Sequence, residues 1–256
     1  MAEDVRIIGV PGIPRITVGD DVGEVAASCM ELAGIGMKEG DVVVVAQTVV
    51  SRSEGCVVRL DAVKPTGRAL RYAGVTGKDP RVVEVVLGES TGVIHAGPGF
   101  LLCETRHGFV CANAGVDSSN AGEGMVTTLP PDPDVSAARI SRSLGRAAGF
   151  AVPVIISDSE GRPFRRGSVG VALGVAGIPP VRSLAGVKDF FGRQLQTTEV
   201  ALADQICSAA NLVMGESGEG IPVAIARGVP PGRGEGIGGL LYEVDVFKEA
   251  MGSDEG

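Results

Sequence analysis

Three glycine-flanked segments of the sequence gather oxygen-bearing side chains. They are residues 113–120 (NAGVDSSN), 157–167 (SDSEGRPFRRG) and 214–220 (MGESGEG). Mg²⁺ and Mn²⁺ take such carboxylate and hydroxyl oxygens as ligands, together with phosphates and waters. The candidate ligands are Asp117, Asp158, Ser159 and Glu216. One such segment alone is typical of a solvated turn, but three in one chain favour a site for metal and phosphate.

A cluster of arginines follows Asp158. Arg162, Arg165 and Arg166 could bind an anionic substrate group, because a guanidinium matches carboxylate and phosphate geometry. The alternative is that these arginines only balance surface charge. The whole chain carries a net charge of -8 with a pI of about 4.9, which argues against binding nucleic acid or an anionic membrane.

Composition indicates a globular protein. The chain has 256 residues, of which 44% are hydrophobic and 21% charged. No stretch approaches the ~18 uncharged apolar residues of a membrane span, and the N-terminus lacks the features of a signal peptide. We therefore expect a cytoplasmic protein. The five cysteines are scattered without a C-x-x-C pair, which predicts reduced thiols instead of disulfides or a zinc site.

The expected helices and strands follow each other irregularly. Helices are predicted over residues 21–33, 79–88, 134–148 and 198–214. Strands are predicted over residues 41–50, 152–157, 170–176 and 221–226, and a hairpin over residues 100–112. Asp21 is the expected N-cap of the first helix. The order lacks the regular strand and helix alternation of a doubly wound parallel sheet, so the predicted class is α+β with mixed sheets.

Two of these strands bear on the site. Residues 41–50 are too apolar for a half-exposed edge, so this strand should be central and buried. The strand over residues 152–157 places Asp158 on the loop just past its end, where binding groups commonly lie. His107 is expected at the hairpin turn, and His95 has no partner at metal spacing, so neither histidine is assigned to the site.

The common nucleotide motifs are missing. The sequence has neither a Walker loop nor a G-x-S-x-G elbow. One G-x-G-x-x-G match, at residues 234–239, follows a double proline and does not lead into a predicted helix. A dinucleotide fingerprint needs that helix, so the match is interpreted as a turn.

Six segments in order resemble one family. They are GIPR (12–15), AQTVVSRSEG (46–55), NAGVDSSN (113–120), SDSEGRPFRRGSVGVALGVAGI (157–178), FGRQLQTTEVALAD (191–204) and LVMGESGEGIPVAIARG (212–228). Through them nearly the whole chain resembles the coenzyme F-420-0:L-glutamate ligases, which add γ-linked glutamates to a deazaflavin coenzyme. The resemblance implies a GTP-dependent amide-forming ligase with a two-lobed α+β fold, unlike P-loop or Rossmann proteins, and an intertwined homodimer. Residues 1–252 would form one catalytic unit, followed by a short polar tail at residues 253–256.

The resemblance also implies roles for individual residues. Two Mg²⁺ or Mn²⁺ ions would be held by Asp117, Asp158, Ser159 and Glu216, and a monovalent cation is a further candidate ligand. The positions matching the family's GTP contacts are Gly12, Ile13, Pro14, Arg15, Gln47, Thr48, Arg52, Asn120, Met214, Gly215, Glu216, Ser217, Gly218, Glu219, Gly220 and Ile221. The other substrates would be L-glutamate and the deazaflavin precursor. No residue is assigned as the general base.

Two departures from the family pattern leave alternatives open. Arg52 stands where the family usually has Lys, and the segment 182–186 (RSLAG) lacks the usual acidic residue. The second departure leaves room for a paralogue that ligates a different acceptor. A non-catalytic GTP-binding protein is a further alternative. Release of phosphate in the presence of an acceptor and glutamate would separate it from the enzymes.

Overall fold

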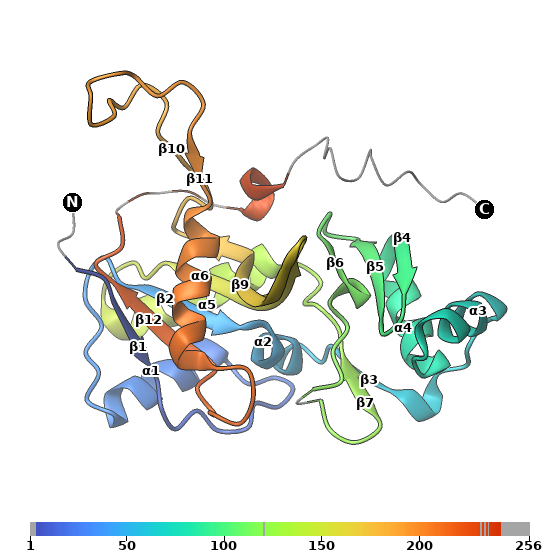
Figure 1. Ribbon diagram of the computed structural model, residues 1–256. Helices are drawn as coiled ribbons and strands as arrows, with labels where there is room; N and C mark the ends of the chain where they lie inside the picture. Colours follow the sequence, from blue (N-terminus) through green and yellow to red (C-terminus); the bar gives the residue numbers. More distant parts are fainter. Residues whose placement is uncertain (1–3, 120, 231, 233, 235, 242–256) are drawn as a thin grey trace.

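The computed structural model describes residues 4–241 except 120, 231, 233 and 235. The larger elements build two lobes on either side of a narrow connection (Figure 1). The helices are α1 (Val22–Leu32), α2 (Gln47–Ser53), α3 (Gly67–Thr76), α4 (Pro80–Glu89), α5 (Pro133–Ala148) and α6 (Leu202–Met214). The strands are β1 (Arg6–Gly9), β2 (Val42–Ala46), β3 (Val57–Arg59), β4 (Ser90–Gly97), β5 (Phe100–Thr105), β6 (Val110–Ala112), β7 (Met125–Thr127), β8 (Val154–Arg162), β9 (Arg165–Ala176), β10 (Arg182–Ser183), β11 (Glu199–Val200) and β12 (Val223–Arg227).

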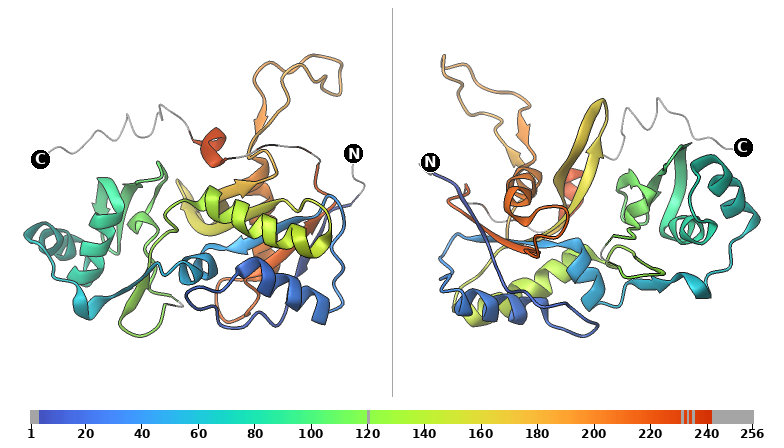
Figure 2. Two further views of the ribbon diagram at one scale, coloured as in Figure 1. Left: turned by 180° about the vertical axis from the view of Figure 1, so that it is seen from behind. Right: turned by 60° about the horizontal axis from the view of Figure 1, so that its bottom comes forward.

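The larger lobe is built on a mixed five-stranded sheet with the order β1-β12-β2-β8-β9. Only β2 and β8 are parallel among these neighbours. Helices α1 and α5 cover one face of the sheet and α6 covers the other (Figure 2). The valines of β2 are fully buried between these layers, which confirms the predicted central strand.

Local signals fix the helices of the larger lobe. The Asp21 carboxylate accepts hydrogen bonds from the backbone amides of Gly23 and Glu24, so it caps α1 as predicted. Asp132 caps α5 in the same way, with Pro133 in the first turn. Gly149 ends α5 with a φ of 79°, a left-handed conformation that suits glycine. Sequence therefore predicted these ends within one or two residues.

The smaller lobe is a continuous insertion with its own core. It packs α3 and α4 against one face of the antiparallel sheet β4-β5-β6. Its buried residues form a cluster separate from the core of the larger lobe and include Leu101, Cys103, Val83 and Val86. The chain enters and leaves this lobe through β3 and β7, which pair with each other antiparallel, Val57 opposite Thr127. The two chain segments that join the lobes therefore run side by side.

Three predicted boundaries were wrong. The strand predicted over residues 41–50 ends at Ala46, and α2 takes its second half, because Gln47 and Ser51 turn inward to bond the Thr128 carbonyl. The helix predicted from residue 198 begins at Leu202, because β11 pairs with β10 first. Asp158 is not on a loop. β8 continues to Arg162 in a hairpin with β9, since β9 pairs with it beyond the edge of the core.

Other expectations are placed as follows. The hairpin over residues 100–112 is confirmed as β5 and β6, with His107 in its turn. All five cysteines are free thiols, and four of them are buried. No described helix is long and apolar enough to cross a membrane. The predicted end of the catalytic unit at residue 252 and the polar tail at 253–256 lie outside the described residues.

Candidate active site

A cleft of about 1550 Å³ lies between the two lobes. All three glycine-flanked segments contribute to its lining, although they are far apart in the sequence. The larger lobe supplies residues of the β8–β9 hairpin and of the loop after α6. The smaller lobe supplies β6 and the segment that follows it. The cleft therefore joins the segments that sequence had marked as a metal and phosphate site.

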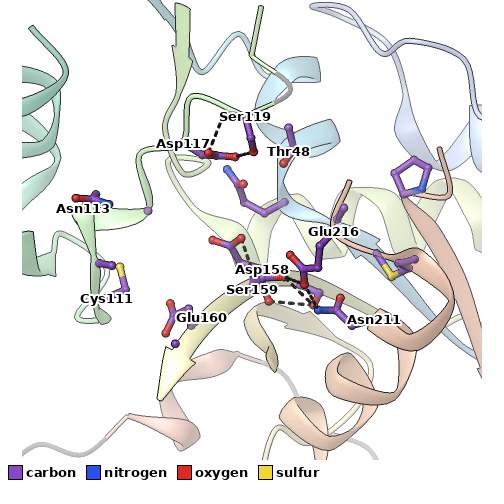
Figure 3. Close-up of a pocket in the computed structure, with 18 of the residues that line it drawn as sticks. Thr48, Cys111, Asn113, Asp117, Ser119, Asp158, Ser159, Glu160, Asn211 and Glu216 are labelled. Carbon is purple, nitrogen blue, oxygen red and sulfur yellow. Dashed lines mark hydrogen bonds between the residues drawn. The ribbon is translucent and has the colours of Figure 1, made fainter. Parts of the chain in front are cut away.

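Asp158, Ser159 and Glu216 form the centre of this cleft (Figure 3). The Ser159 backbone amide donates a hydrogen bond of 2.8 Å to Asp158 Oδ1. The Ser159 hydroxyl donates to Glu216 Oε1 over 2.6 Å, and the Asn211 amide donates to Glu216 Oε1 over 2.8 Å and to Ser159 Oγ over 3.1 Å. These bonds hold the loop after α6 against strand β8.

Gly215 allows Glu216 to take this position. It has a φ of 72°, and a Cβ there would lie 2.1 Å from Cδ of Glu219. Any other residue at this position would be strained by the positive φ and would push the Glu219 side chain aside. The Glu219 carboxylate folds back to accept a hydrogen bond from the Ser217 backbone amide over 2.8 Å.

Asp117 approaches the same centre from the connection between the lobes. Its backbone amide and carbonyl pair with Thr127 of β7, and its carboxylate accepts hydrogen bonds from the backbone amide and hydroxyl of Ser119. The chain reaches it through three consecutive left-handed residues, Asn113, Ala114 and Gly115. A Cβ on Gly115 would lie 2.7 Å from the Leu129 side chain, so this close passage requires glycine.

The electrostatics of the centre favour a cation. Burial, together with the negative charges of Asp117 and Glu216, raises the pKa of Asp158 to about 6 against the opposing effect of the hydrogen bond from Ser159. No ion pair between described residues includes any of these three carboxylates. A partly buried group of negative charges is costly unless a positive charge joins it.

The donor set fits magnesium or manganese that arrives with a nucleotide. Its oxygens are carboxylates and hydroxyls, the hard ligands these ions prefer. No three His, Cys, Asp or Glu side chains within the described residues converge closely enough to hold an ion by themselves. Mg²⁺ commonly binds one or two carboxylates and completes its shell with phosphates and waters. Spaced carboxylates on two sides of a cleft suit that arrangement.

Most positions that match the family's GTP contacts line the cleft. Those that do are Ile13, Pro14, Arg15, Gln47, Thr48, Arg52, Met214, Gly215, Glu216, Ser217, Gly220 and Ile221. Gly12, Gly218 and Glu219 belong to the same segments but do not line it, and Asn120 lies outside the described residues. Arg162 and Arg165 also line the cleft, whereas Arg166 does not. The roles of the matching positions in GTP binding stay predictions.

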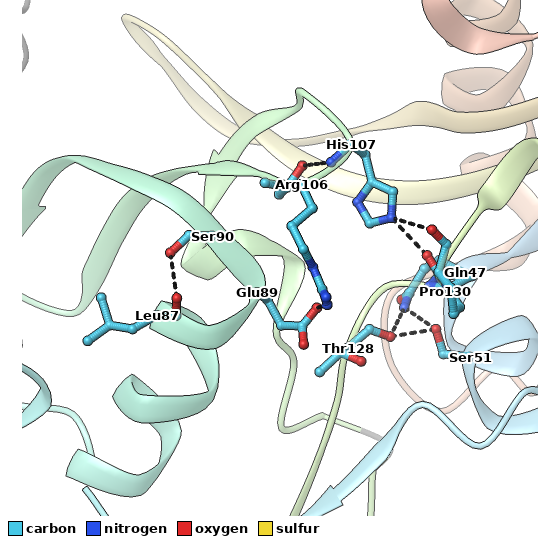
Figure 4. A network of polar contacts seen from close by, with 11 residues as sticks. Gln47, Ser51, Leu87, Glu89, Ser90, Arg106, His107, Thr128 and Pro130 are labelled. Carbon is cyan, nitrogen blue, oxygen red and sulfur yellow. Dashed lines mark hydrogen bonds and ion pairs between the residues drawn. The ribbon is translucent and has the colours of Figure 1, made fainter. Parts of the chain in front are cut away.

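A polar network beside the cleft ties the lobes together (Figure 4). The Gln47 amide donates to Ser51 Oγ over 2.6 Å and to the Thr128 carbonyl over 3.1 Å. From the smaller lobe, His107 Nε2 lies 3.0 Å from the Pro130 carbonyl oxygen, while its buried Nδ1 has no hydrogen-bond partner. Gln47 thus lines the cleft while its amide nitrogen also stabilises the connection.

Sequence reasoning missed three residues of the site. Asn211 and Ser119 hold the carboxylates in place, and Glu160 stands in the cleft two positions after Asp158. Burial raises the pKa of Glu160 to about 8, helped by the charges of Asp158 and Asp204. Glu160 and Ser119 lie inside the marked segments, so composition could have found them. Asn211 lies in a helix, and only its contacts reveal its role.

Comparison with known proteins identifies the family of the chain. Residues 12–228 match the family described as F420-0:Gamma-glutamyl ligase. Curated relatives named Coenzyme F420:L-glutamate ligase include one from Methanothermobacter thermautotrophicus, 48% identical over 95% of this chain and 99% of the relative. Others come from Methanocaldococcus jannaschii, 50% identical over 85% of this chain and 88% of the relative, and Archaeoglobus fulgidus, 41% identical over 96% and 98%. The chain therefore belongs to the F420-0:gamma-glutamyl ligase family.

Proposed function

We propose that this protein is a GTP-dependent ligase that adds L-glutamate in γ-linkage to the deazaflavin coenzyme F420 precursor, with divalent metal. The observation that carries the proposal is the meeting of the three oxygen-rich segments in one interlobe cleft with the segments that match the family's nucleotide contacts. The names of the curated relatives supply the acceptor and the amino acid.

The chemistry requires activation of the acceptor carboxylate. Amide formation from a carboxylate is uphill in water, so transfer of the GTP γ-phosphoryl to an acceptor carboxylate oxygen would form an acyl phosphate and release GDP. The glutamate amine would then attack the acyl carbon, lose a proton and expel phosphate. Divalent ions would neutralise charge on the phosphates and the incoming carboxylate.

In this scheme, residues of the cleft would position the metal ions and the anionic groups of the substrates. Asp117, Asp158, Ser159 and Glu216 would hold the ions, and hydrogen bonds from Ser159 and Asn211 hold the Glu216 carboxylate at the centre. Arg162 and Arg165, at the end of the β8–β9 hairpin, could bind a carboxylate or phosphate of a substrate. Arg182 and Ser183 belong to the segment 182–186, which departs from the family pattern. They do not line the cleft, so this departure does not change the lining of the cleft.

Mass spectrometry of the deazaflavin acceptor tests the function directly. Incubation with the protein, GTP, Mn²⁺ and L-glutamate should add whole glutamate residues to the acceptor and release one phosphate for each. GTP binding without phosphate release would instead indicate a non-catalytic protein. Phosphate release with another acid, but not with the deazaflavin, would identify a paralogue with a different acceptor.

We also propose a homodimer. Strands β10 and β11 begin an arm that projects from the body of the larger lobe (Figure 1). Near its end, Phe190 and Phe191 are 98% and 90% exposed and contact each other edge to face. Aromatic side chains exposed in this way commonly mark a protein interface. Phe190→Asp should shift the sedimentation coefficient toward that of a monomer, while Leu212→Asp, at an exposed position on α6, should not.

A further inference from the structure

The sheet of the smaller lobe turns one face toward the cleft. We call this the apolar face. Its residues line the cleft and are Ile94, Phe100, Leu102, Val110 and Ala112. Phe100 and Val110 remain 39% and 41% exposed. An exposed apolar patch inside a cleft is typical of a ligand-binding wall.

Strand register explains why the face is bare. Leu102 pairs with Ala112, and adjacent strand residues alternate between the two faces of a sheet. Leu101 and Cys103 therefore point the other way, into the core under α3 and α4, where both are fully buried. One face of the sheet therefore packs on the core of the smaller lobe, and the other face lines the cleft.

Phe100 is held in place on this face. It follows a turn at Pro98 and Gly99, where Gly99 has a φ of 87°. Its ring lies against the backbone of Gly97, since a Cβ on Gly97 would be 2.9 Å from Phe100 Cε1. The His95 ring lies 6.1 Å away, centroid to centroid. The ring is thus preorganised to stack against a flat ligand.

The smaller lobe, whose strand β6 carries part of the apolar face, lies across Asp158 from two of the predicted nucleotide contacts. In Figure 3, Asp158 stands between Cys111 and Asn113 of the smaller lobe on one side and Thr48 and Glu216 of the larger lobe on the other. In-line phosphoryl transfer needs the attacking oxygen opposite the leaving group. A nucleotide on the Thr48 side would therefore face an acceptor that approaches from the smaller lobe.

Cationic side chains border the same approach. Strand β6 lies beside β8, and Arg162 and Arg165 at the end of the β8–β9 hairpin line the cleft together with the apolar face. The apolar face next to guanidinium groups suits a ligand that joins a flat aromatic ring to an anionic chain. A free amino acid such as glutamate has no such ring.

We infer that the apolar face, with Phe100 stacked on the ring, binds the flat heteroaromatic ring of the acceptor, whose anionic chain then passes Arg162 and Arg165 to reach Asp158 and Glu216. This inference rests on the proposed ligase function for the identity of the acceptor. The other ligand of the same chemistry is GTP, whose base is also flat and whose phosphates are anionic. The experiment must separate the two.

Binding of the deazaflavin acceptor and of GTP is measured separately by calorimetry, in the presence of Mg²⁺ and without glutamate. Phe100→Ala should raise the Kd for the acceptor about tenfold, or about 1.4 kcal/mol, because the ring would lose its stacking partner. Its Kd for GTP should stay unchanged. Leu70→Ala is the matched control, because Leu70 is 55% exposed on α3 of the same lobe and does not line the cleft.

Phe100→Trp should restore acceptor affinity. The chain has no tryptophan, so the introduced indole would be the single one and its emission should fall when the acceptor binds but not when GTP binds. Val110→Ser, at a strand position that is already exposed, gives an independent reading if Phe100→Ala fails to fold. It should weaken acceptor binding without affecting GTP.

Three results would overturn the inference: wild-type protein that does not bind the acceptor, unchanged acceptor affinity in both weakened variants, or a loss confined to GTP, which would place the guanine base on the face. Failure of the ligase proposal would look different. Wild-type protein would then bind the acceptor through Phe100 yet transfer no glutamate, and the apolar face would stand as a ring-binding site.

Discussion

The hydroxyl of Ser159 donates a hydrogen bond of 2.6 Å to the carboxylate of Glu216, across a sequence separation of 57 residues. Asn211 donates to both partners, so the three side chains form a closed set of contacts between β8 and the end of α6. This set fixes one carboxylate beside Asp158 before any ligand binds. The site is therefore preorganised on its larger-lobe side, where the carboxylates are expected to meet the phosphates.

Asp158→Asn should abolish turnover without weakening the fold. Loss of groups that merely support a metal ligand costs about 10–100-fold, so loss of the ligand should exceed roughly a hundredfold in kcat. Because burial and neighbouring carboxylates raise the pKa of Asp158, removing its charge should also raise the Tm of metal-free protein. Steady-state kinetics and thermal melts measure the two effects.

Asp204→Asn is the matched control for that variant. Asp204 is also a carboxylate whose pKa is raised by burial, but it accepts a hydrogen bond from the Ala172 backbone amide and does not line the cleft. It should keep the wild-type rate. Equal rates for Asp158→Asn and wild type, with the same metal dependence, would exclude the proposed metal site.

Nucleotide affinity should depend steeply on divalent metal. No Walker lysine is present in the sequence, so bound cations and loop amides must neutralise the phosphates. Chelation of metal should weaken GTP binding at least tenfold, which is about 1.4 kcal/mol. Calorimetry with and without chelator tests this. Metal-independent binding of GTP would contradict the shared site, whereas efficient ligation with ATP would contradict only the preference for guanine.

Arg52→Ala should affect GTP more than glutamate. Arg52 lines the cleft from α2, and its guanidinium donates a hydrogen bond of 3.0 Å to the Ala121 carbonyl, next to the segment of Asp117. A charge-assisted contact with phosphate contributes about 1.5–3 kcal/mol, so the KM for GTP should rise by roughly tenfold or more. Small and equal changes in both KM values would indicate that Arg52 serves only the structure. Arg52→Lys should retain part of the affinity, because the charge remains.

Loss of the Asp21 cap should matter least in acid. Burial alone would raise the pKa of Asp21, but hydrogen bonds from Ser143 and from the amides of Glu24 and Gly23, together with Arg146, outweigh it and lower the pKa below 3.8. The ionised form is therefore favoured in the folded state. Its stabilisation is complete above the unfolded pKa and is lost as the pH falls through the folded pKa.

Asp21→Ala should accordingly reduce the free energy of unfolding by about 1 kcal/mol at neutral pH. The difference from wild type should shrink as the pH falls below about 3.8. Denaturant unfolding at neutral pH and at pH values through this range measures it. A constant difference at all pH values would assign the effect to packing and not to the charge. Asp21→Asn keeps a capping oxygen, so it should reduce the free energy of unfolding by less than Asp21→Ala.

Local signals predicted much of the fold, and non-local contacts decided the rest. Asp21 and Asp79 marked helix starts correctly because a cap depends on the next few residues only. The strand predicted through Val50 became helical after Ala46, since the contacts of Gln47 and Ser51 lie about eighty positions away at Thr128. Asp158 was assigned to a loop because its polar neighbours resemble one, and only pairing with β9 makes them a strand.

The candidate site divides in the same way. The oxygen-rich composition of three segments favoured one metal and phosphate site and marked Asp117, Asp158 and Glu216, but nothing in their spacing predicts that this site lies in a cleft between two lobes. Asn211 has no distinguishing neighbours in the sequence. The apolar face was also not predicted. Phe100 and Val110 have the same residue types as core positions, and only the fold leaves them exposed.

The pairing of Val57 with Thr127 makes the smaller lobe one uninterrupted stretch of sequence with adjoining ends. A single genetic exchange between those two positions would replace the whole apolar wall of the cleft and leave Asp158, Ser159 and Glu216 untouched. Asp117 would travel with the exchanged stretch, so any donor sequence must bring its own carboxylate there. Exchange of this one module would therefore change the wall that we infer to bind the acceptor and would keep the half that carries Asp158 and Glu216.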